Sequence, residues 1–449
     1  MTGLYFERAL LPEGWAQNVR VTLADGRFAS VEAGAVAVPG DERHAIAFPG
    51  LANLHSHAFQ RGMAGLAETA GPNDDDFWSW RETMYRFVLT LDPDRIEAIA
   101  AYAFAEMLEA GFTTVGEFHY LHHQPDGTPY ANRAELAERI AAASATSGIG
   151  LTLLPVFYAH GNFGNAPPSA RQARFLNDID GFGTLLDGCR KAVSGLDGGV
   201  VGVAPHSLRA ASADEVKAVA AMAPNGPVHI HAAEQVKEVE DCEAATGLRP
   251  ADFLLEKIGI DTRWCLIHAT HLTAGETRRL AASGAVAGLC PVTESNLGDG
   301  IFPSADYLRA GGRFGIGTDS NILISAADEL KSIEYIQRLK YRARNVLAPK
   351  GGSTGRRIFD GALAGGAQAL GLGPVGFAVG AKADIVTLQA GHPSVALAKG
   401  DGLLDAWIFA GAPIDSVWRH GVKLVTGGVH YDRAALHHRY DRALKALQD

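Results

Sequence analysis

The middle of the chain alternates short apolar runs with longer amphipathic stretches. Stretches such as 94–111 and 134–148 repeat their apolar residues at helical spacing and end on glycine, which predicts helices. The apolar runs, which predict strands, lie at residues 47–57, 112–118, 151–158, 200–207, 227–234, 265–272, 285–292 and 314–321. Eight strands joined by crossover helices are typical of an α/β protein of the (β/α)8 TIM barrel class, here over residues 49–370. A doubly wound open sheet is the alternative, but no G-x-G-x-x-G turn follows the first strand.

Both ends of the chain have a different texture from the middle. Residues 1–48 contain short alternating runs, with the Asp25-Gly26 pair placed as a hairpin turn. Residues 371–449 repeat this pattern and finish in an amphipathic stretch that predicts a C-terminal helix. We therefore expect a small β-sandwich domain formed by the N- and C-terminal segments. The Gly-rich stretch 350–376 is interpreted as the connection from the barrel to this domain.

Composition narrows the class of protein. The 449 residues are 47% apolar and 20% charged, which is enough to bury a large core. The formal charge of −10 argues against nucleic acid as the main partner. Four cysteines without C-x-x-C spacing, no apolar run long enough for a membrane span and no export signal at the start predict a cytoplasmic protein.

Chemically capable side chains stand where the predicted strands end. They are His55, His57, Glu117, His206, His231, His268 and Asp319. In a barrel of this class the carboxyl ends of all strands face one cavity, where active sites are built. These positions, scattered along the sequence, are therefore expected to converge.

Four of these residues form a candidate metal site. His55 and His57 are two apart in a strand, so that both imidazoles point to the same face. With His231 and Asp319 they make a set of nitrogen and oxygen ligands that suits one Zn²⁺, with Fe²⁺ or Mn²⁺ as alternatives. Taken singly, each of these residues is as well explained by a buried histidine or a turn-capping aspartate.

Two further residues supply acid–base chemistry in this interpretation. Glu234 follows His231 by three residues and is placed to exchange a proton with water at the metal. His268 is placed to orient that water and to stabilise developing charge. Together with Asp319 these are the predicted catalytic residues. A glutamate in a first helical turn and a core histidine are the plain structural alternatives.

The motifs H-S-H (55–57), H-A-A-E-Q (231–235), L-I-H-A-T-H (266–271) and G-T-D-S-N (317–321) together resemble the amidohydrolase superfamily, in particular its mononuclear deaminase branch. The resemblance covers essentially the whole chain. It implies attack of a metal-bound hydroxide on a planar C=N carbon and release of ammonia. The fourth strand lacks the bridging Lys or Glu of binuclear members, which favours a single metal. Glu117 is the remaining candidate ligand, with turn hydrogen bonding or a helix dipole as its expected role.

More local strings, H-S-H-A-F-Q-R, D-F-W-S-W-R-E and A-P-H-S-L-R, resemble the formimidoylglutamate deiminase family. This resemblance implies deimination of N-formimino-L-glutamate to N-formyl-L-glutamate and ammonia, in histidine degradation. It also implies that arginines bind the carboxylates of the substrate, as their chemistry favours. The implied substrate-binding residues are Gln60, Arg81, Tyr120, His206 and Arg209. Arg61, beside Gln60, is an alternative that the sequence leaves open.

Two other functions stay open at this point. A deaminase of guanine, an adenosine derivative or another aminated heterocycle would use similar chemistry. A catalytically silent barrel with a binding role is disfavoured by the intact set of metal ligands, Glu234 and His268. The expected partners are a small dicarboxylate substrate and a second copy of the chain in a homodimer, and neither nucleic acid nor a membrane.

Overall fold

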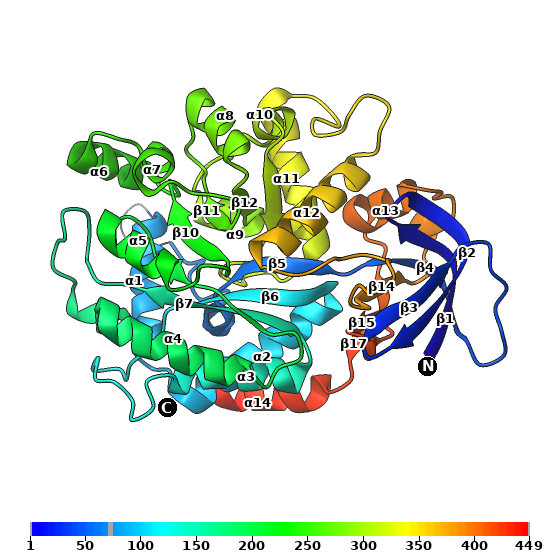
Figure 1. Ribbon diagram of the computed structural model, residues 1–449, viewed down its shortest axis with the longest axis horizontal. Coiled ribbons are helices and arrows are strands. Elements are labelled where there is room, and N and C mark those ends of the chain that lie inside the picture. The colour runs from blue at the N-terminus through cyan, green and yellow to red at the C-terminus, as the bar shows by residue number, and fades with distance from the viewer. Residues whose placement is uncertain (1, 71–74, 448–449) are drawn as a thin grey trace.

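The structure is a computed structural model that describes residues 2–70 and 75–447. A parallel sheet forms its centre (Figure 1), with neighbouring strands in the order β10-β11-β12-β13-β5-β6-β7-β8, and β9 pairing with β7. Its strands are β5 (Leu51–Ser56), β6 (Phe112–His119), β7 (Gly150–Phe157), β8 (Val200–Val201), β9 (Ala204–Pro205), β10 (Val228–Ala232), β11 (Trp264–His268), β12 (Val286–Leu289) and β13 (Arg313–Ile316).

The sheet closes on itself between β9 and β10. The backbone N–H of Val203 donates to the Pro227 carbonyl over 3.0 Å, and that of His231 donates to the His206 carbonyl over 3.0 Å. Closure confirms the predicted (β/α)8 barrel. The fourth barrel strand is short and broken, because Gly202 weakens it and Pro205 has no N–H to donate.

Helices surround the barrel and cover the outer faces of its strands (Figure 1). They are α2 (Pro93–Glu109), α3 (Glu135–Ser147), α4 (Ile179–Val193), α5 (Ala213–Ala221), α6 (Val236–Thr246), α7 (Pro250–Phe253), α8 (Ala274–Ser283), α9 (Pro291–Leu297), α10 (Ser304–Arg309), α11 (Ala326–Tyr341) and α12 (Thr354–Ala369). Further helical elements lie in the loops: η1 (Ala58–Met63), α1 (Phe77–Val88), η2 (Ala170–Phe175) and η3 (Leu254–Ile258).

The two ends of the chain form one mixed sheet beside the barrel, in the order β17-β16-β15-β14-β4-β1-β2-β3. Its strands are β1 (Thr2–Leu11), β2 (Gly14–Ala24), β3 (Arg27–Glu32), β4 (Glu42–Pro49), β14 (Ile385–Leu388), β15 (Ile414–Arg419), β16 (Val422–Thr426) and β17 (Val429–His430). The predicted hairpin turn is present between β2 and β3, with positive φ at Asp25 and Gly26. The sheet curls until the N–H of Phe28 reaches the Ala381 carbonyl, 3.1 Å away, and this encloses a separate core.

Three helical elements interrupt or follow the C-terminal strands: η4 (Pro393–Val395), α13 (Gly402–Ala410) and α14 (Arg433–Lys445). The predicted C-terminal helix, α14, returns to the barrel and packs along α2 (Figure 1). Residue 1 and residues 448–449, which the sequence assigned to the β domain, lie outside the described residues. Among the residues that the structure describes, no helix is both long enough and apolar enough to cross a membrane.

The interpretation of 350–376 as a simple connection is wrong for residues 354–369, which form α12. Glycine lowers helix propensity, so the sequence pattern favoured a loop. The glycines serve close packing instead. Gly361 and Gly365 face Phe314 of β13, and a side chain at either position would meet it.

This close approach predicts opposite effects for two glycine-to-alanine changes. At Gly365 the added methyl would overlap the backbone carbonyl of Phe314, and we expect a loss of roughly 1–3 kcal/mol in unfolding free energy. Gly183 of α4 has open space and an ordinary φ, so alanine there should stabilise by about 0.5–1 kcal/mol. Thermal unfolding of both variants checks this, and stabilisation by Gly365→Ala would contradict the packing argument.

Candidate active site

The four predicted metal ligands converge at the carboxyl ends of the barrel strands. His55 and His57 come from β5, His231 from β10, and Asp319 from the loop after β13. The Nε2 atoms of His55 and His231 are 3.2 Å apart, and Asp319 Oδ1 lies 3.5 Å from His55 Nε2 and 3.3 Å from His57 Nε2. Ligand atoms of the three histidines all lie within 4.8 Å of one another. One ion can therefore contact the three histidines, and Asp319 stands beside two of them.

Hydrogen bonds to backbone carbonyls orient the rings of His57 and His231 so that the lone pair of each Nε2 atom points toward this centre. His57 Nδ1 donates to the Phe118 carbonyl over 3.0 Å, and His231 Nδ1 donates to the His206 carbonyl over 3.1 Å. A carbonyl only accepts, so the proton sits on Nδ1 and each Nε2 carries a lone pair. This is the tautomer that a metal ligand requires.

Burial keeps these imidazoles neutral. It lowers the pKa of His55 to about 3 and lowers the pKa of His57 and of His231 below the ordinary value. Burial acts to raise the pKa of Asp319, but His55 and His57 together lower it. Neutral nitrogen donors facing an ionised carboxylate fit a divalent cation of the zinc type.

Glu234 and His268 stand beside this donor set. His268 Nε2 lies 3.6 Å from Glu234 Oε1 and 3.8 Å from Asp319 Oδ2. Burial raises the pKa of Glu234 to about 7. For His268, burial opposes the charged ring, but Glu234, Glu294 and Asp319 outweigh it and raise the pKa well above its ordinary value. The pair therefore holds a transferable proton near neutral pH.

Two buried glutamates that the sequence analysis missed support this pair. Glu238 of α6 accepts the backbone N–H groups of Ala233 (3.2 Å) and Glu234 (3.1 Å). Glu294 of α9 accepts the N–H of Cys290 over 2.9 Å and faces His268 Nδ1 at 3.3 Å. Both belong to helices that follow the strands, and the sequence analysis considered only residues at the strand ends.

The backbone is left-handed at several of these positions. The φ angles are 53° at Ala233, 66° at His268 and 44° at Asp319, none of which is glycine. Such angles cost of order 1–3 kcal/mol each and persist only where the surroundings enforce them. Here they turn the chain sharply at the strand ends and aim the functional side chains into one cavity.

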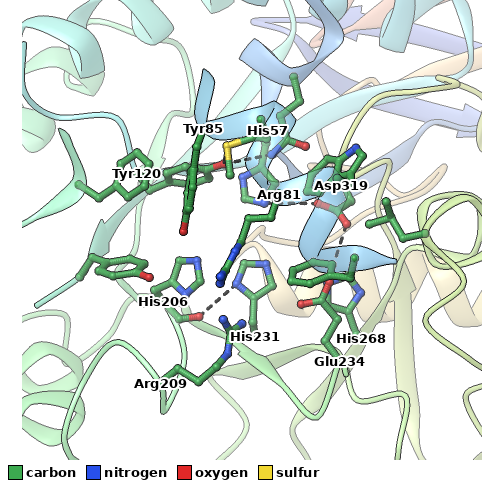
Figure 2. Close-up of a pocket in the computed structure, with 17 residues that line it drawn as sticks. His57, Arg81, Tyr85, Tyr120, His206, Arg209, His231, Glu234, His268 and Asp319 are labelled. Atoms are coloured by element: carbon green, nitrogen blue, oxygen red, sulfur yellow. Dashed lines mark hydrogen bonds and ion pairs between the residues drawn. The ribbon is translucent and has the colours of Figure 1, made fainter. Parts of the chain in front are cut away.

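That cavity, about 600 Å³ with the solvent-open space at its mouth included, lies between the metal donors and helix α1. All five predicted substrate-binding residues line it: Gln60, Arg81, Tyr120, His206 and Arg209. Arg81 comes from α1 and points into the cavity across from Arg209 (Figure 2). The guanidinium of Arg81 stacks on the ring of Trp78, 4.5 Å from its centroid.

The charged groups at this end of the cavity are donors. The Nε atoms of Arg81 and Arg209 are buried without a hydrogen-bond partner, and within residues 2–70 and 75–447 neither arginine forms an ion pair. Burial and the Arg209 charge lower the pKa of His206, which leaves its ring neutral. Gln60 Nε2 donates to the Tyr120 hydroxyl over 3.0 Å.

Two residues that the sequence left undecided lie outside the cavity lining. Arg61 is paired with Glu106 over 2.7 Å and also donates to the carbonyls of Asn321 and Ile322. Glu117 accepts the N–H of Ala58 over 2.7 Å, which is the turn hydrogen bond expected for it, and burial raises its pKa to about 8. Tyr85 and Tyr158, which the sequence analysis did not single out, do line the cavity.

Residues 46–423 match the profile of the "Amidohydrolase family". The chain belongs to this family. Residues 1–45 match "Formimidoylglutamate deiminase HutF, N-terminal domain". The chain is 51% identical to formimidoylglutamate deiminase of Pseudomonas aeruginosa, over 92% of this chain and 91% of that protein. The resemblance inferred from short motifs is thus confirmed for this amidohydrolase.

Two further relatives, one similar and one more distant, were compared with this chain. A crystal structure of an amidohydrolase from Brucella melitensis superposes with a TM-score of 0.98 at 55% identity, covering 100% of both chains. The 8-oxoguanine deaminase of Pseudomonas aeruginosa is only 28% identical, over 90% of this chain and 88% of that protein. Heterocycle deaminases are therefore distant relatives of this amidohydrolase.

Two histidines on β10 provide a matched test of the metal site. His231 faces the donor set, whereas His229, two residues earlier, is equally buried and bonds through Nε2 to the Ala369 carbonyl at 2.7 Å. We expect His231→Gln to lose most of the bound metal and His229→Gln to retain it, because only the first removes a ligand. Elemental analysis of the purified variants measures this. Equal metal content in both would contradict the assignment.

Proposed function

We propose that this enzyme hydrolyses N-formimino-L-glutamate to N-formyl-L-glutamate and ammonia. One observation carries the choice of substrate: Arg209, which is buried, and Arg81, which is half-buried, enter the cavity with buried Nε atoms that have no hydrogen-bond partner, and neither forms an ion pair among the described residues. Glu238 and Glu234 act on Arg209 only without direct contact, and a substrate carboxylate would supply the direct partner that a charged-group hydrogen bond requires.

The opposite end of the cavity complements the other part of this substrate. The carboxyl groups of Asp319 and Glu234 line it and can accept hydrogen bonds from the nitrogen atoms of the formimino group. A purine has a formimino-like carbon but no carboxylates, and would leave both arginines unpaired. The polarity of the cavity therefore favours a formimino dicarboxylate over a heterocycle.

The residues around the donor set support a hydrolytic mechanism. A divalent cation, when bound there, acts as a Lewis acid and lowers the pKa of water in the site. Glu234 takes a proton from the attacking water as the new C–O bond forms at the formimino carbon. It then returns the proton to the terminal nitrogen. As the bond between this nitrogen and the carbon breaks, the new hydroxyl group loses its remaining proton through Glu234 to the departing ammonia, which leaves the formyl C=O and ammonium. His268, held by Glu294, donates to the oxygen that attacks.

Three further features belong to the proposal. We propose one Zn²⁺ per subunit, held by His55, His57, His231 and Asp319, because three neutral imidazoles and a carboxylate form a borderline donor set. We also propose that the enzyme works in the cytoplasm and as a homodimer. Light scattering of the purified protein tests the dimer.

Ammonia release from a substrate panel tests the function. N-formimino-L-glutamate should be turned over, whereas guanine and adenosine should not. Replacing either carboxylate by an amide should lower kcat/KM roughly 10- to 100-fold, because a hydrogen bond to a charged group is lost. Arg209→Met should raise KM by a similar factor, with exposed Arg190→Met as the control. Equal turnover of the diacid and both monoamides would contradict the carboxylate clamp.

Glu234→Gln separates proton transfer from metal binding. The amide retains the shape of the side chain but cannot accept a proton, so we expect kcat to fall about 10²- to 10⁴-fold with metal content unchanged. Glu240→Gln, on the exposed face of α6, is the control and should behave as the wild type. A Glu234→Gln protein with both full metal and full turnover would disprove the proton-transfer role.

A further inference from the structure

Two phenols in the cavity wall have no role in the proposal so far. Tyr85 belongs to α1, and Tyr158 follows the end of β7. Both are almost fully buried, at 5% and 4% exposure, and both line the cavity. The Tyr85 hydroxyl points into the cavity near His206 and Arg81 (Figure 2), and Tyr158 is one of the neighbours that raise its pKa.

The direction of one hydrogen bond to Tyr158 is fixed by a neighbouring glutamine. The backbone N–H of Ser169 donates to Gln172 Oε1 over 2.7 Å, and a backbone N–H has no other option. The amide nitrogen of Gln172 must therefore face the other way, and it lies 2.6 Å from the Tyr158 hydroxyl. An amide nitrogen only donates, so the phenolic oxygen of Tyr158 accepts.

Tyr85 stands beside Tyr158 in the same wall. Burial and the neighbouring Tyr158 raise the pKa of Tyr85 to about 12, so this phenol keeps its proton at neutral pH. Because Tyr158 accepts from Gln172, its own proton is directed away from Gln172 and is available to another group. No hydrogen bond found within residues 2–70 and 75–447 takes up that proton.

Two arginines stand beside these phenols. Arg209 interacts electrostatically with Glu238, Tyr158, Glu234 and Tyr85, and Arg81 stacks 5.4 Å from the centroid of the Tyr85 ring. Within the described residues neither guanidinium forms an ion pair, so the two guanidinium groups and the Tyr158 hydroxyl make a cluster of donors that can converge on one ligand. Such a cluster fits one ligand class, a carboxylate.

We propose that Tyr158, oriented by Gln172, donates a hydrogen bond to a substrate carboxylate that the arginines bind. Tyr158 is thereby a specificity-determining residue for a dicarboxylate. This inference rests on the proposed function and adds a residue that discriminates a carboxylate from its amide. Gln60 and Tyr120 make a similar pair, but Gln60 Oε1 has no partner, so its amide is not oriented in the same way.

Tyr158→Phe tests the donor directly. We expect KM for N-formimino-L-glutamate to rise about tenfold or more while kcat changes less than about twofold, because the bond is made equally in ground and transition states. For one of the two monoamide analogues the rise should be less than about twofold, and that analogue identifies the carboxylate bound. Tyr85→Phe should have a smaller effect, since Gln172 still orients Tyr158. Tyr307→Phe, which removes a buried phenol outside the cavity, should lower thermal stability without changing KM.

Equal changes for the diacid and both monoamides would overturn the proposal, as would a larger effect from Tyr85→Phe than from Tyr158→Phe. If the wild type does not turn over N-formimino-L-glutamate, the proposed function has failed, and binding of glutarate by calorimetry still decides the inference. Tighter binding of glutarate to the wild type than to Tyr158→Phe would support it, and equal binding would refute it.

Gln172→Glu tests the direction of the hydrogen bond. The carboxylate retains the bond from Ser169 but accepts the Tyr158 proton, which turns the phenol away from the substrate. The added charge repels a substrate carboxylate as well, so the same change is also made in a Tyr158→Phe background. We expect the rise in KM to be at least about threefold larger when Tyr158 is present. The same fold-change in both backgrounds would show that Gln172 does not orient Tyr158.

Discussion

The carbonyl oxygen of His206 accepts two hydrogen bonds from one residue, and much of the site depends on them. The backbone N–H of His231 donates to it over 3.0 Å, and the ring Nδ1 of His231 over 3.1 Å. The first bond closes the barrel at its weakest strand, and the second fixes the tautomer that leaves Nε2 free for a metal. Closure of the barrel and orientation of the His231 ligand therefore depend on the same carbonyl oxygen. The side chain of His206 meanwhile reaches the substrate cavity, so both halves of the site share this residue.

The charge of the site is limited by its surroundings. Several carboxyl groups are buried together, and each unpaired charge would be expensive. Burial raises the pKa of Asp299 to about 9 and that of Glu117 to about 8, which leaves both neutral near pH 7. The neighbouring histidines lower the pKa of Asp319 instead. Negative charge is thereby retained on Asp319, beside the metal donors, and removed from Asp299 and Glu117.

The sequence predicts those parts of the structure that repeat a period or end a strand. The barrel strands and the ligands at their ends follow from apolar runs, because parallel strands converge at one face. The resemblance to a known family predicted Arg81 as a substrate-binding residue, although it lies in helix α1 and not at the end of a strand. No such signal marks Tyr85, Tyr158 or Gln172. In the sequence a tyrosine that lines a cavity cannot be told from a tyrosine that packs in the core, because only the folded structure shows its neighbours. Two features differ from the simple pattern. The fourth strand is broken because Gly202 weakens it and Pro205 has no N–H to donate. Residues 354–369 form a helix despite their glycines, because these glycines allow close packing against β13.

Another buried arginine shows what distinguishes the two in the cavity. Arg174 is fully buried and forms no ion pair within the described parts of the chain, yet it donates to the backbone carbonyls of Val88, Leu91 and His123 and leaves only Nη2 without a partner. It thereby ties the end of α1 to the loop after β6. An unpartnered arginine nitrogen is therefore no mark of a ligand by itself. The Nε atoms of Arg81 and Arg209 differ in their place, because both residues line the cavity that holds the metal donors. Only there can a substrate carboxylate reach the guanidinium groups and supply the missing acceptor.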